Sequence, residues 1–449
     1  MHTHNRFIQM SALALGIAGA LAFGQAQASG FQLKENSVKA MGRAFAGSGV
    51  ATGDASVVVN NPATMTSFEG TTIQADVTVI DLNASFDGSG YAATGTPLAR
   101  PITGSDGGNA GGATPVPAMS LIHKFSNGLT VGAMVSAPFG LKTEYDNGWV
   151  GRYHALTSDL KTVDLTLSAA YEIVPDRFSV GAGIVYERAE AELSKAVDFG
   201  SALALSSVPG FAPQSADGEA VITGDDTGFG YIFGLNFRPT DKLAIGLSHR
   251  SEIDHELQGK ADWTVPSNAR TVFNAIGRSA LFNDGKASAK LTTPSVTTLS
   301  VAYQLNDSLA LMADYTETDW HSLEEIRIDF GNADPDSVED FSWGDTRFWS
   351  IGAEYKLSEA FTLRGGYAYD ETPTTFATRT PRLPDEDRRW YSLGLTWNMS
   401  ENVEINASYT RIEPDTPKIG IIDAANRHAL FGEFSSDVNL FGLSGRYSF

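Results

Sequence analysis

Long stretches of this chain alternate apolar and polar residues with a period of two, the pattern of a β-strand whose two faces meet different surroundings. Residues 162–171 are one example, with apolar side chains at odd positions from Val163 to Tyr171 and Thr, Asp or Ser opposite them. The alternation continues to the last residue, Phe449. It predicts fourteen strands, near residues 72–86, 115–125, 129–145, 160–173, 178–197, 227–238, 242–264, 288–305, 309–329, 346–357, 361–372, 388–399, 403–413 and 437–449.

Short polar turns connect the predicted strands at six places, and an aromatic residue repeatedly lies beside the turn. Tyr171, Tyr303, Tyr355 and Trp397 each end a strand just before such a turn. Aromatic rings are enriched where a membrane meets water, so this placement favours a membrane barrel over a soluble β-sandwich. The six short connections alternate with seven long ones. We therefore expect an antiparallel fourteen-stranded outer-membrane β-barrel, with its short turns in the periplasm and its long loops outside the cell.

The first 28 residues have the features of a secretory signal peptide. Arg6 precedes an apolar run over residues 10–23, and Ala26-Gln27-Ala28 predicts cleavage before Ser29. No later apolar run is long enough for a membrane-spanning helix, which needs about 18 residues. If the chain crosses a membrane, it must do so as a closed barrel, because only helices and closed barrels satisfy the backbone hydrogen bonds inside lipid.

Composition narrows the function further. The formal net charge is −21, which argues against nucleic acid as a partner. The chain has no cysteine, so it has no disulfide, thiolate metal site or cysteine nucleophile. No G-x-S-x-G, H-E-x-x-H or P-loop motif occurs, and the histidines beyond the signal peptide are scattered without an i, i+4 pair. We expect no enzyme activity, no cofactor and no metal.

Three segments near the N-terminus carry a family resemblance: residues 29–33 (Ser-Gly-Phe-Gln-Leu), residues 41–47 (Met-Gly-Arg-Ala-Phe-Ala-Gly) and Asn61-Pro62-Ala63. In order and spacing they resemble the opening of the FadL family of outer-membrane transporters for long-chain fatty acids and other hydrophobic compounds. Further similar segments span the rest of the mature chain, at residues 148–154, 158–160, 249–253, 319–320, 370–373 and 384–388.

After the signal peptide, residues 1–28, the resemblance implies a hatch inside the lumen, over residues 29–70, and a fourteen-stranded barrel, over residues 71–449. From the residues alone, the segment 29–70 is either a disordered leader or a compact plug. Asn61 is a good helix N-cap and Pro62 suits the first helical position, so a short helix is predicted there, with an ordinary Asn-Pro turn as the alternative. The resemblance implies that Asn61, Pro62 and Ala63 form a hatch motif.

The third predicted strand contains Pro138-Phe139-Gly140. Proline removes a donor from the hydrogen-bond ladder and glycine relaxes the backbone, so the wall is expected to be locally open there. The alternative is that the strand ends at Ala137. The resemblance implies that Pro138, Phe139 and Gly140 form a lateral gate, through which a hydrophobic molecule leaves sideways into the outer membrane.

Two long exterior loops carry unusually many apolar residues. Between Asn268 and Phe282 they recur at helical spacing and include Phe273 and Ile276, and residues 200–213 include Leu203. Apolar loops outside the cell favour a groove that captures a hydrophobic guest. The alternative is that each loop simply covers the other.

A fatty acid also presents a carboxylate, which needs a cation once it leaves water. Strand positions offer Arg188, Arg347 and Arg364 as candidate ligand-binding residues, together with Arg250 and Arg388. Each of them can instead pair with a carboxylate of the lumen. The resemblance also implies that Phe31 reaches the lumenal pocket, and it places Leu193 where some members appear to have a basic residue.

The sequence thus predicts a passive outer-membrane transporter for hydrophobic molecules, most simply long-chain fatty acids. Exterior loops capture the molecule, the lumen binds it, the hatch rearranges, and the molecule leaves at the break in the third strand. The partners expected are the hydrophobic cargo and outer-membrane lipid, and the chain is expected to be a monomer. The alternatives are an uptake channel for aromatic hydrocarbons or alkanes, a general porin, and a phage receptor.

Overall fold

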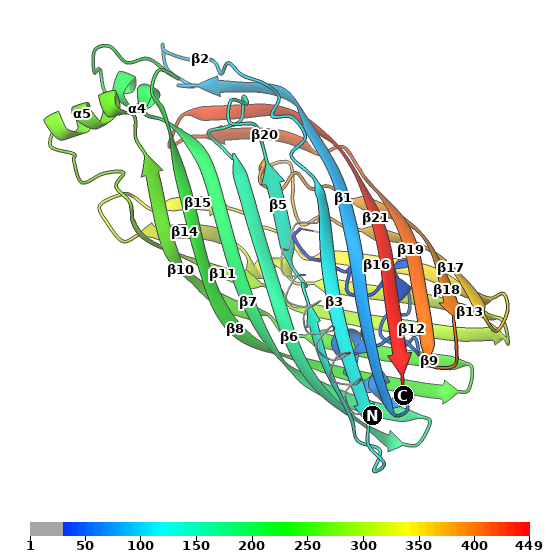
Figure 1. Cartoon of the computed structure of the whole chain (residues 1–449). Coiled ribbons are helices and arrows are strands. Elements are labelled where there is room, and N and C mark those ends of the chain that lie inside the picture. Colours follow the sequence, from blue (N-terminus) through cyan, green and yellow to red (C-terminus); the bar gives the residue numbers. More distant parts are fainter. Residues whose placement is uncertain (1–29) are drawn as a thin grey trace, which may run out of the picture.

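The computed structural model describes residues 30–449, so the predicted signal peptide and its cleavage site lie outside the described residues. Antiparallel strands close into one tall barrel (Figure 1). Closure occurs where β1 (Thr71–Ala92) pairs with β3 (Ala113–Lys124) on one side and with β21 (His428–Ser448) on the other. The wall has fourteen strands, which confirms the fold predicted from alternation.

Eight further wall strands are continuous: β6 (Thr157–Val174), β7 (Phe178–Asp198), β8 (Asp217–Thr240), β13 (Leu309–Thr318), β16 (Thr346–Lys356), β17 (Phe361–Asp370), β18 (Arg388–Asn398) and β19 (Val403–Pro414). Three wall strands are divided into two segments each: β4 (Thr130–Ser136) and β5 (Gly140–Glu144), β9 (Leu243–Arg250) and β10 (Ile253–Thr264), and β11 (Gly285–Thr293) and β12 (Val296–Asn306). The six predicted short turns all connect neighbouring wall strands.

Long loops gather at the opposite end of the barrel from these short turns (Figure 1). They contain the short strands β2 (Arg100–Pro101), β14 (Glu325–Phe330), β15 (Ser337–Asp340) and β20 (Lys418–Asp423), the helices α4 (Phe199–Leu205) and α5 (Ser267–Ala275), and the 3₁₀ turn η2 (Trp320–Ser322). None of the helices in residues 30–449 is long and apolar enough to cross a membrane.

Side chains alternate along the wall as the sequence predicts. Outward positions such as Leu167, Phe229 and Leu393 are exposed, whereas the inward positions beside them are buried. The inward face is rich in hydroxyl and charged groups, including the buried Asp76 and Glu404 and the partly buried Glu354. This distribution suits a wall with lipid on one side and a polar, filled lumen on the other.

Residues 30–70, which we call the hatch, fold inside the barrel (Figure 1). They contain the helices α2 (Val38–Met41) and α3 (Val57–Asn60) and the 3₁₀ helix η1 (Pro62–Ser67). The residues alone predicted either a disordered leader or a compact plug, and the structure shows the compact plug. Ion pairs tie it to the wall: Lys39 Nζ lies 3.0 Å from Glu404, and Arg43 Nη1 lies 2.8 Å from Glu354.

The Asn61-Pro62-Ala63 motif begins η1 as predicted. The Asn61 side chain accepts a hydrogen bond from the Ala63 amide at 3.2 Å, and Pro62 occupies the first turn. The same side chain donates to the carbonyl of Leu235 on β8 at 2.9 Å, so one residue both caps the helix and attaches it to the wall. A Cβ atom on Gly234 would lie only 2.0 Å from Asn61 Oδ1, so this close approach requires glycine on the wall.

The third wall strand is interrupted where Pro138-Phe139-Gly140 predicts a break. Its first segment, β4, pairs with both β3 and β6. Its second segment, β5, pairs with β6 alone, so the ladder to β3 is absent above the break. The strand therefore neither ends at Ala137 nor continues regularly, and the wall loses its hydrogen bonds on one side.

Candidate functional site

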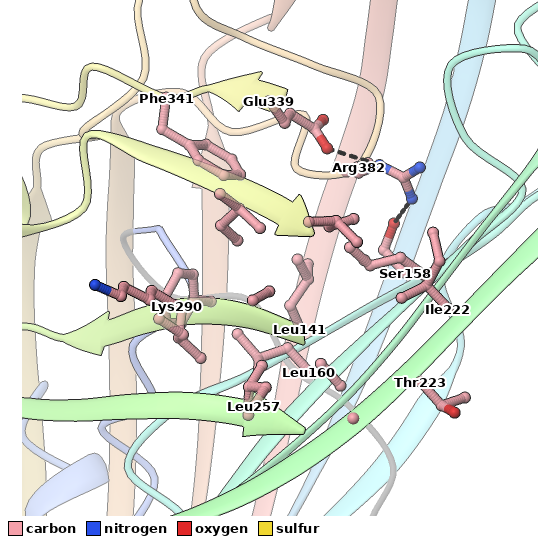
Figure 2. Close-up of a pocket in the computed structure, with 18 of the residues that line it drawn as sticks. Leu141, Ser158, Leu160, Ile222, Thr223, Leu257, Lys290, Glu339, Phe341 and Arg382 are labelled. Carbon is pink, nitrogen blue, oxygen red and sulfur yellow. Dashed lines mark hydrogen bonds and ion pairs between the residues drawn. The ribbon is translucent and has the colours of Figure 1, made fainter. Parts of the chain in front are cut away.

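An apolar cavity lies within the barrel on the loop side of the hatch (Figure 2). Strands β5, β6, β7, β8, β10, β11 and β14 supply most of its wall, and most of the lining residues are aliphatic or aromatic. The space between its lining residues is about 830 Å³, part of which is open to solvent. The lining includes Leu141, Leu160, Leu193, Ile222, Leu257, Leu291, Ile328, Phe341 and Trp343.

Three polar side chains, Ser158, Glu339 and Arg382, meet at one edge of this apolar cavity (Figure 2). Arg382 donates to Ser158 Oγ at 2.9 Å, and its Nε lies 3.1 Å from a Glu339 oxygen (Figure 2). The Arg382 side chain is buried. Lys290 also borders the cavity, but its amine points away from it in Figure 2. The site therefore combines an apolar lining with a guanidinium group at one edge.

The first residues of the hatch close the cavity on another side. Phe31 is buried, lines the cavity, and packs edge-on against Trp320 with the ring centroids 4.7 Å apart. Its ring also lies 5.9 Å from that of Phe139, in the break of the third strand. Phe31 therefore lines this cavity, and its part in ligand binding stays a prediction.

The hatch also pairs with the break itself. The Leu33 amide donates to the Pro138 carbonyl at 2.7 Å, and the Gly140 amide donates to the Phe31 carbonyl at 2.8 Å. These bonds flank an antiparallel bridge between Gln32 and Phe139. Residues 31–33 thus supply the strand partner that β3 does not provide, and they fill the break while the hatch stays in this position.

The cations singled out from the sequence lie elsewhere. Arg188 lies on the outward face of β7, is half-exposed and pairs with Glu190 and Asp225. Arg347 is exposed on the outward face of β16. Arg364 faces the lumen but is bound to Glu354 beside the hatch. None of the three lines the apolar cavity, whereas Arg382, in a loop without periodic pattern, does.

The two apolar exterior loops pack against each other. Leu203 on α4 and Phe273 on α5 are both buried in one apolar cluster, and Phe199 stacks edge-on against Phe273. Ile276 follows α5 and is half-exposed. In this conformation the loops cover each other, which was the alternative to an open groove, so a captured molecule would have to separate the helices.

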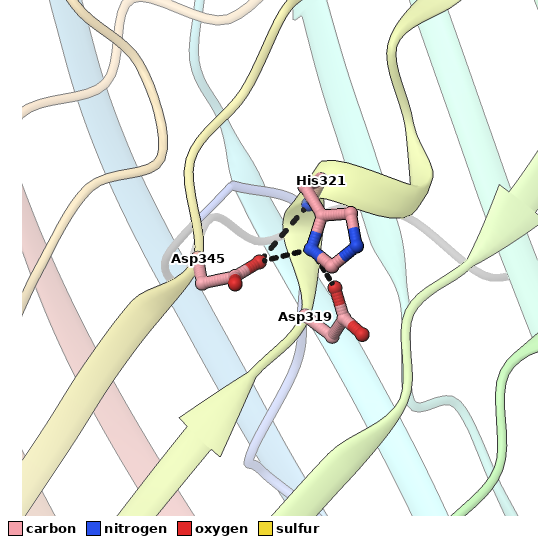
Figure 3. A group of neighbouring side chains, drawn as sticks. All are labelled: Asp319, His321 and Asp345. Atoms are coloured by element: carbon pink, nitrogen blue, oxygen red, sulfur yellow. Dashed lines mark hydrogen bonds and ion pairs between the residues drawn. The ribbon is translucent and has the colours of Figure 1, made fainter.

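A histidine and two aspartates meet where β13 ends and β16 begins (Figure 3). His321 Nδ1 lies 2.9 Å from Asp345 Oδ1 and also contacts Asp319 Oδ1, and the His321 amide donates to Asp345. The hydrogen bond to Asp345 and the charges of both aspartates raise the pKa of His321. The sequence did not reveal this group, because Asp345 lies across a long loop from the other two residues.

Residues 19–449 match the family described as outer membrane protein transport protein (OMPP1/FadL/TodX). The chain belongs to this family. A long-chain fatty acid transport protein of Escherichia coli is 26% identical over 97% of this chain and 98% of its own length. The crystal structure of a Pseudomonas aeruginosa FadL homologue shares 26% identity, with a TM-score of 0.86 over 94% of this chain and 100% of that one.

A crystal structure of the P. putida toluene transporter TodX has a TM-score of 0.68 and 18% identity, covering 93% of this chain and 99% of that one. At this identity the likeness shows the shared barrel fold. Membership of the family establishes an outer-membrane transport protein for hydrophobic compounds, in agreement with the resemblance found in the sequence.

Proposed function

We propose that this chain is a passive, non-enzymatic and monomeric channel that takes up long-chain fatty acids. The observation that carries the proposal is the apolar cavity, an aliphatic and aromatic chamber with one buried guanidinium group, Arg382, at its edge. Each methylene group buried in such a chamber contributes about 0.8 kcal/mol, so a long acyl chain binds there much more strongly than a short one.

The route follows from the order of the parts. The α4 and α5 loops separate to admit the acid, and the apolar cavity then holds its acyl chain. Displacement of Phe31 withdraws the hatch segment from the break in the third strand. Because β5 has no ladder to β3, the molecule can then leave sideways into the membrane without breaking further wall hydrogen bonds.

Aromatic hydrocarbons are the second candidate cargo, and one observation favours them. Arg382 already contacts Glu339 and Ser158, and Leu193 adds an apolar side chain to the cavity. A neutral guest would leave the contact between Arg382 and Glu339 intact, whereas a carboxylate bound there would compete with Glu339 for the guanidinium group.

Uptake of labelled oleate and labelled toluene separates the two cargoes. The host cells lack their own transporter and express either this chain or an empty vector. We expect oleate uptake above the vector control, reduced in the Leu257→Arg variant, which places a long charged side chain in the apolar cavity. Toluene uptake without oleate uptake would replace the fatty acid with a hydrocarbon, and uptake of neither would refute the transport of both.

A further inference from the structure

A second cavity lies on the other side of residues 31–34 and differs from the first in chemistry. The space between its lining residues is about 890 Å³, part of which is open to solvent. Its charged lining consists of the cations Lys34 and Arg250 and the carboxylates Asp164 and Asp314, and Pro138 lies beside them at the break. We call it the polar cavity. Phe31 lines the apolar cavity, whereas Gln32, Leu33 and Lys34 line the polar one, so this short segment is the partition between them.

Lys34 is the hatch cation that faces the polar cavity. Its Nζ lies 4.2 Å from the centroid of the Phe348 ring, and it forms no ion pair with the described residues within 4.0 Å. Burial lowers the pKa of Lys34, and the charges of Asp370, Asp314 and Glu35 oppose that change from a greater distance. The charged amine loses hydration on burial and has no close carboxylate partner among the described residues. A carboxylate bound against it would offset this cost.

Arg250 contributes a second donor to the same cavity. Its Nη2 lies 2.8 Å from both Asp164 and Glu187, which hold the guanidinium group in place. Its Nη1 is buried without a hydrogen-bond partner. The group also lies over the ring of Phe139, with 5.3 Å between the guanidinium carbon and the ring centroid, so this unused donor sits directly beside the break.

We propose that the polar cavity is a carboxylate-binding site, in which Lys34 and Arg250 Nη1 receive the head group of a fatty acid before it leaves through the break. This inference rests on the proposed function and assigns the head group to a site separate from Arg382. The acyl chain stays in the apolar cavity, and the head group crosses the partition once Phe31 is displaced.

The arrangement gives the passage a chemical selectivity. A carboxylate that leaves water is costly unless it meets a cation or several donors, and the polar cavity offers both beside the exit. An alcohol of the same length can accept a hydrogen bond from Lys34 but gains no attraction between opposite charges. The site therefore favours acids over the corresponding alcohols, which an entirely apolar passage cannot do.

Binding measurements on the purified, folded barrel test this site. The variant Lys34→Met keeps most of the length of the side chain and removes its charge, Lys34→Arg keeps the charge, and Lys356→Met removes an exposed lysine beside a short turn. Each protein is titrated with oleate and with oleyl alcohol. We expect Lys34→Met to weaken oleate binding about tenfold or more and oleyl alcohol binding much less, and both other variants to match the unmodified chain.

The outcomes separate the two proposals. If the unmodified chain binds no oleate, the proposed function fails. If it binds oleate and Lys34→Met binds it equally well, the proposed function stands and the carboxylate site is refuted. Equal weakening of oleate and oleyl alcohol would also refute the site, because it would show that Lys34 acts on the shape of the hatch. Oleate binding in Lys34→Arg that falls as in Lys34→Met would exclude a role of its charge.

Discussion

Glu35 is a buried hatch carboxylate whose replacement by glutamine should change the pH dependence of the hatch. Glu35 directly follows the partition, residues 31–34. Within the described chain neither of its side-chain oxygens has a hydrogen-bond partner. Burial raises the pKa of Glu35 from its ordinary 4.5 to about 7, although nearby backbone amides and the charges of Lys34 and Arg388 act in the opposite direction. The ionised form is therefore poorly accommodated when the hatch is closed.

The size of the effect follows from this difference in pKa. When the segment opens and Glu35 reaches water, its pKa returns towards 4.5, so opening is linked to loss of a proton. The stability that the proton gives to the closed segment is present below about pH 4.5 and is lost as the pH rises to about 7. Over that interval the closed state loses about 3 kcal/mol, which corresponds to a roughly 300-fold increase in the opening constant.

Hydrogen exchange at the amides of Leu33 and Gly140 reports this opening, because both donate to the pairing between hatch and break. After correction for intrinsic exchange, the opening constant of the unmodified chain should rise with pH, whereas Glu35→Gln should give a nearly flat profile. Glu401→Gln, in an exposed turn, is the matched control and should behave as the unmodified chain. A flat profile in the unmodified chain, or the same slope in Glu35→Gln, would refute the reasoning.

Three other predictions concern the hatch and the apolar cavity. A Cβ on Gly181 would lie 2.5 Å from the backbone of the hatch motif, so Gly181→Leu should loosen the hatch and raise ion conductance in planar bilayers. A Cβ on Gly445 would contact no atom within 4 Å, so Gly445→Leu is the control and should leave the conductance unchanged. Asn61→Ala removes the cap of η1 and the hydrogen bond to the Leu235 carbonyl. Hydrogen exchange should show that the opening free energy of η1 falls by about 1 kcal/mol or more, and unchanged protection would contradict the role of Asn61 as cap and wall contact. Leu257→Arg should weaken oleate binding at least tenfold by titration, and Leu257→Met should bind nearly normally; equal binding by both would remove the apolar cavity from the route.

Much of the barrel could be predicted because each wall strand is determined by residues that are close together in the sequence. Alternation with a period of two marks each wall strand, and the aromatic residues beside the short turns mark one rim. The break in the third strand is equally local, since Pro138 cannot donate to a ladder. The structure accordingly shows β4 ending at Ser136 and β5 beginning at Gly140.

The ligand site could be predicted only in part. Phe31 lines the apolar cavity, but the candidate cation Arg188 faces outward, because its neighbour Glu187 occupies the inward face of the same strand. The alternation of apolar and polar residues along β7 already indicates that Arg188 faces outward. Arg382 and Lys34 carry no such signal, because both lie in irregular segments that reach the cavities only when distant parts of the chain fold together.

The central claim is that the hatch must leave the break in the third strand before cargo passes. Gln32 and Phe139 form a non-hydrogen-bonded antiparallel pair, whose Cα atoms lie about 4.5 Å apart in such ladders, within the range of a disulfide. The chain has no cysteine, so the double variant Gln32→Cys, Phe139→Cys can form only this one bond within the chain. Labelled oleate uptake should stop when the pair is oxidised and return on reduction, and undiminished uptake by the oxidised protein would contradict the account.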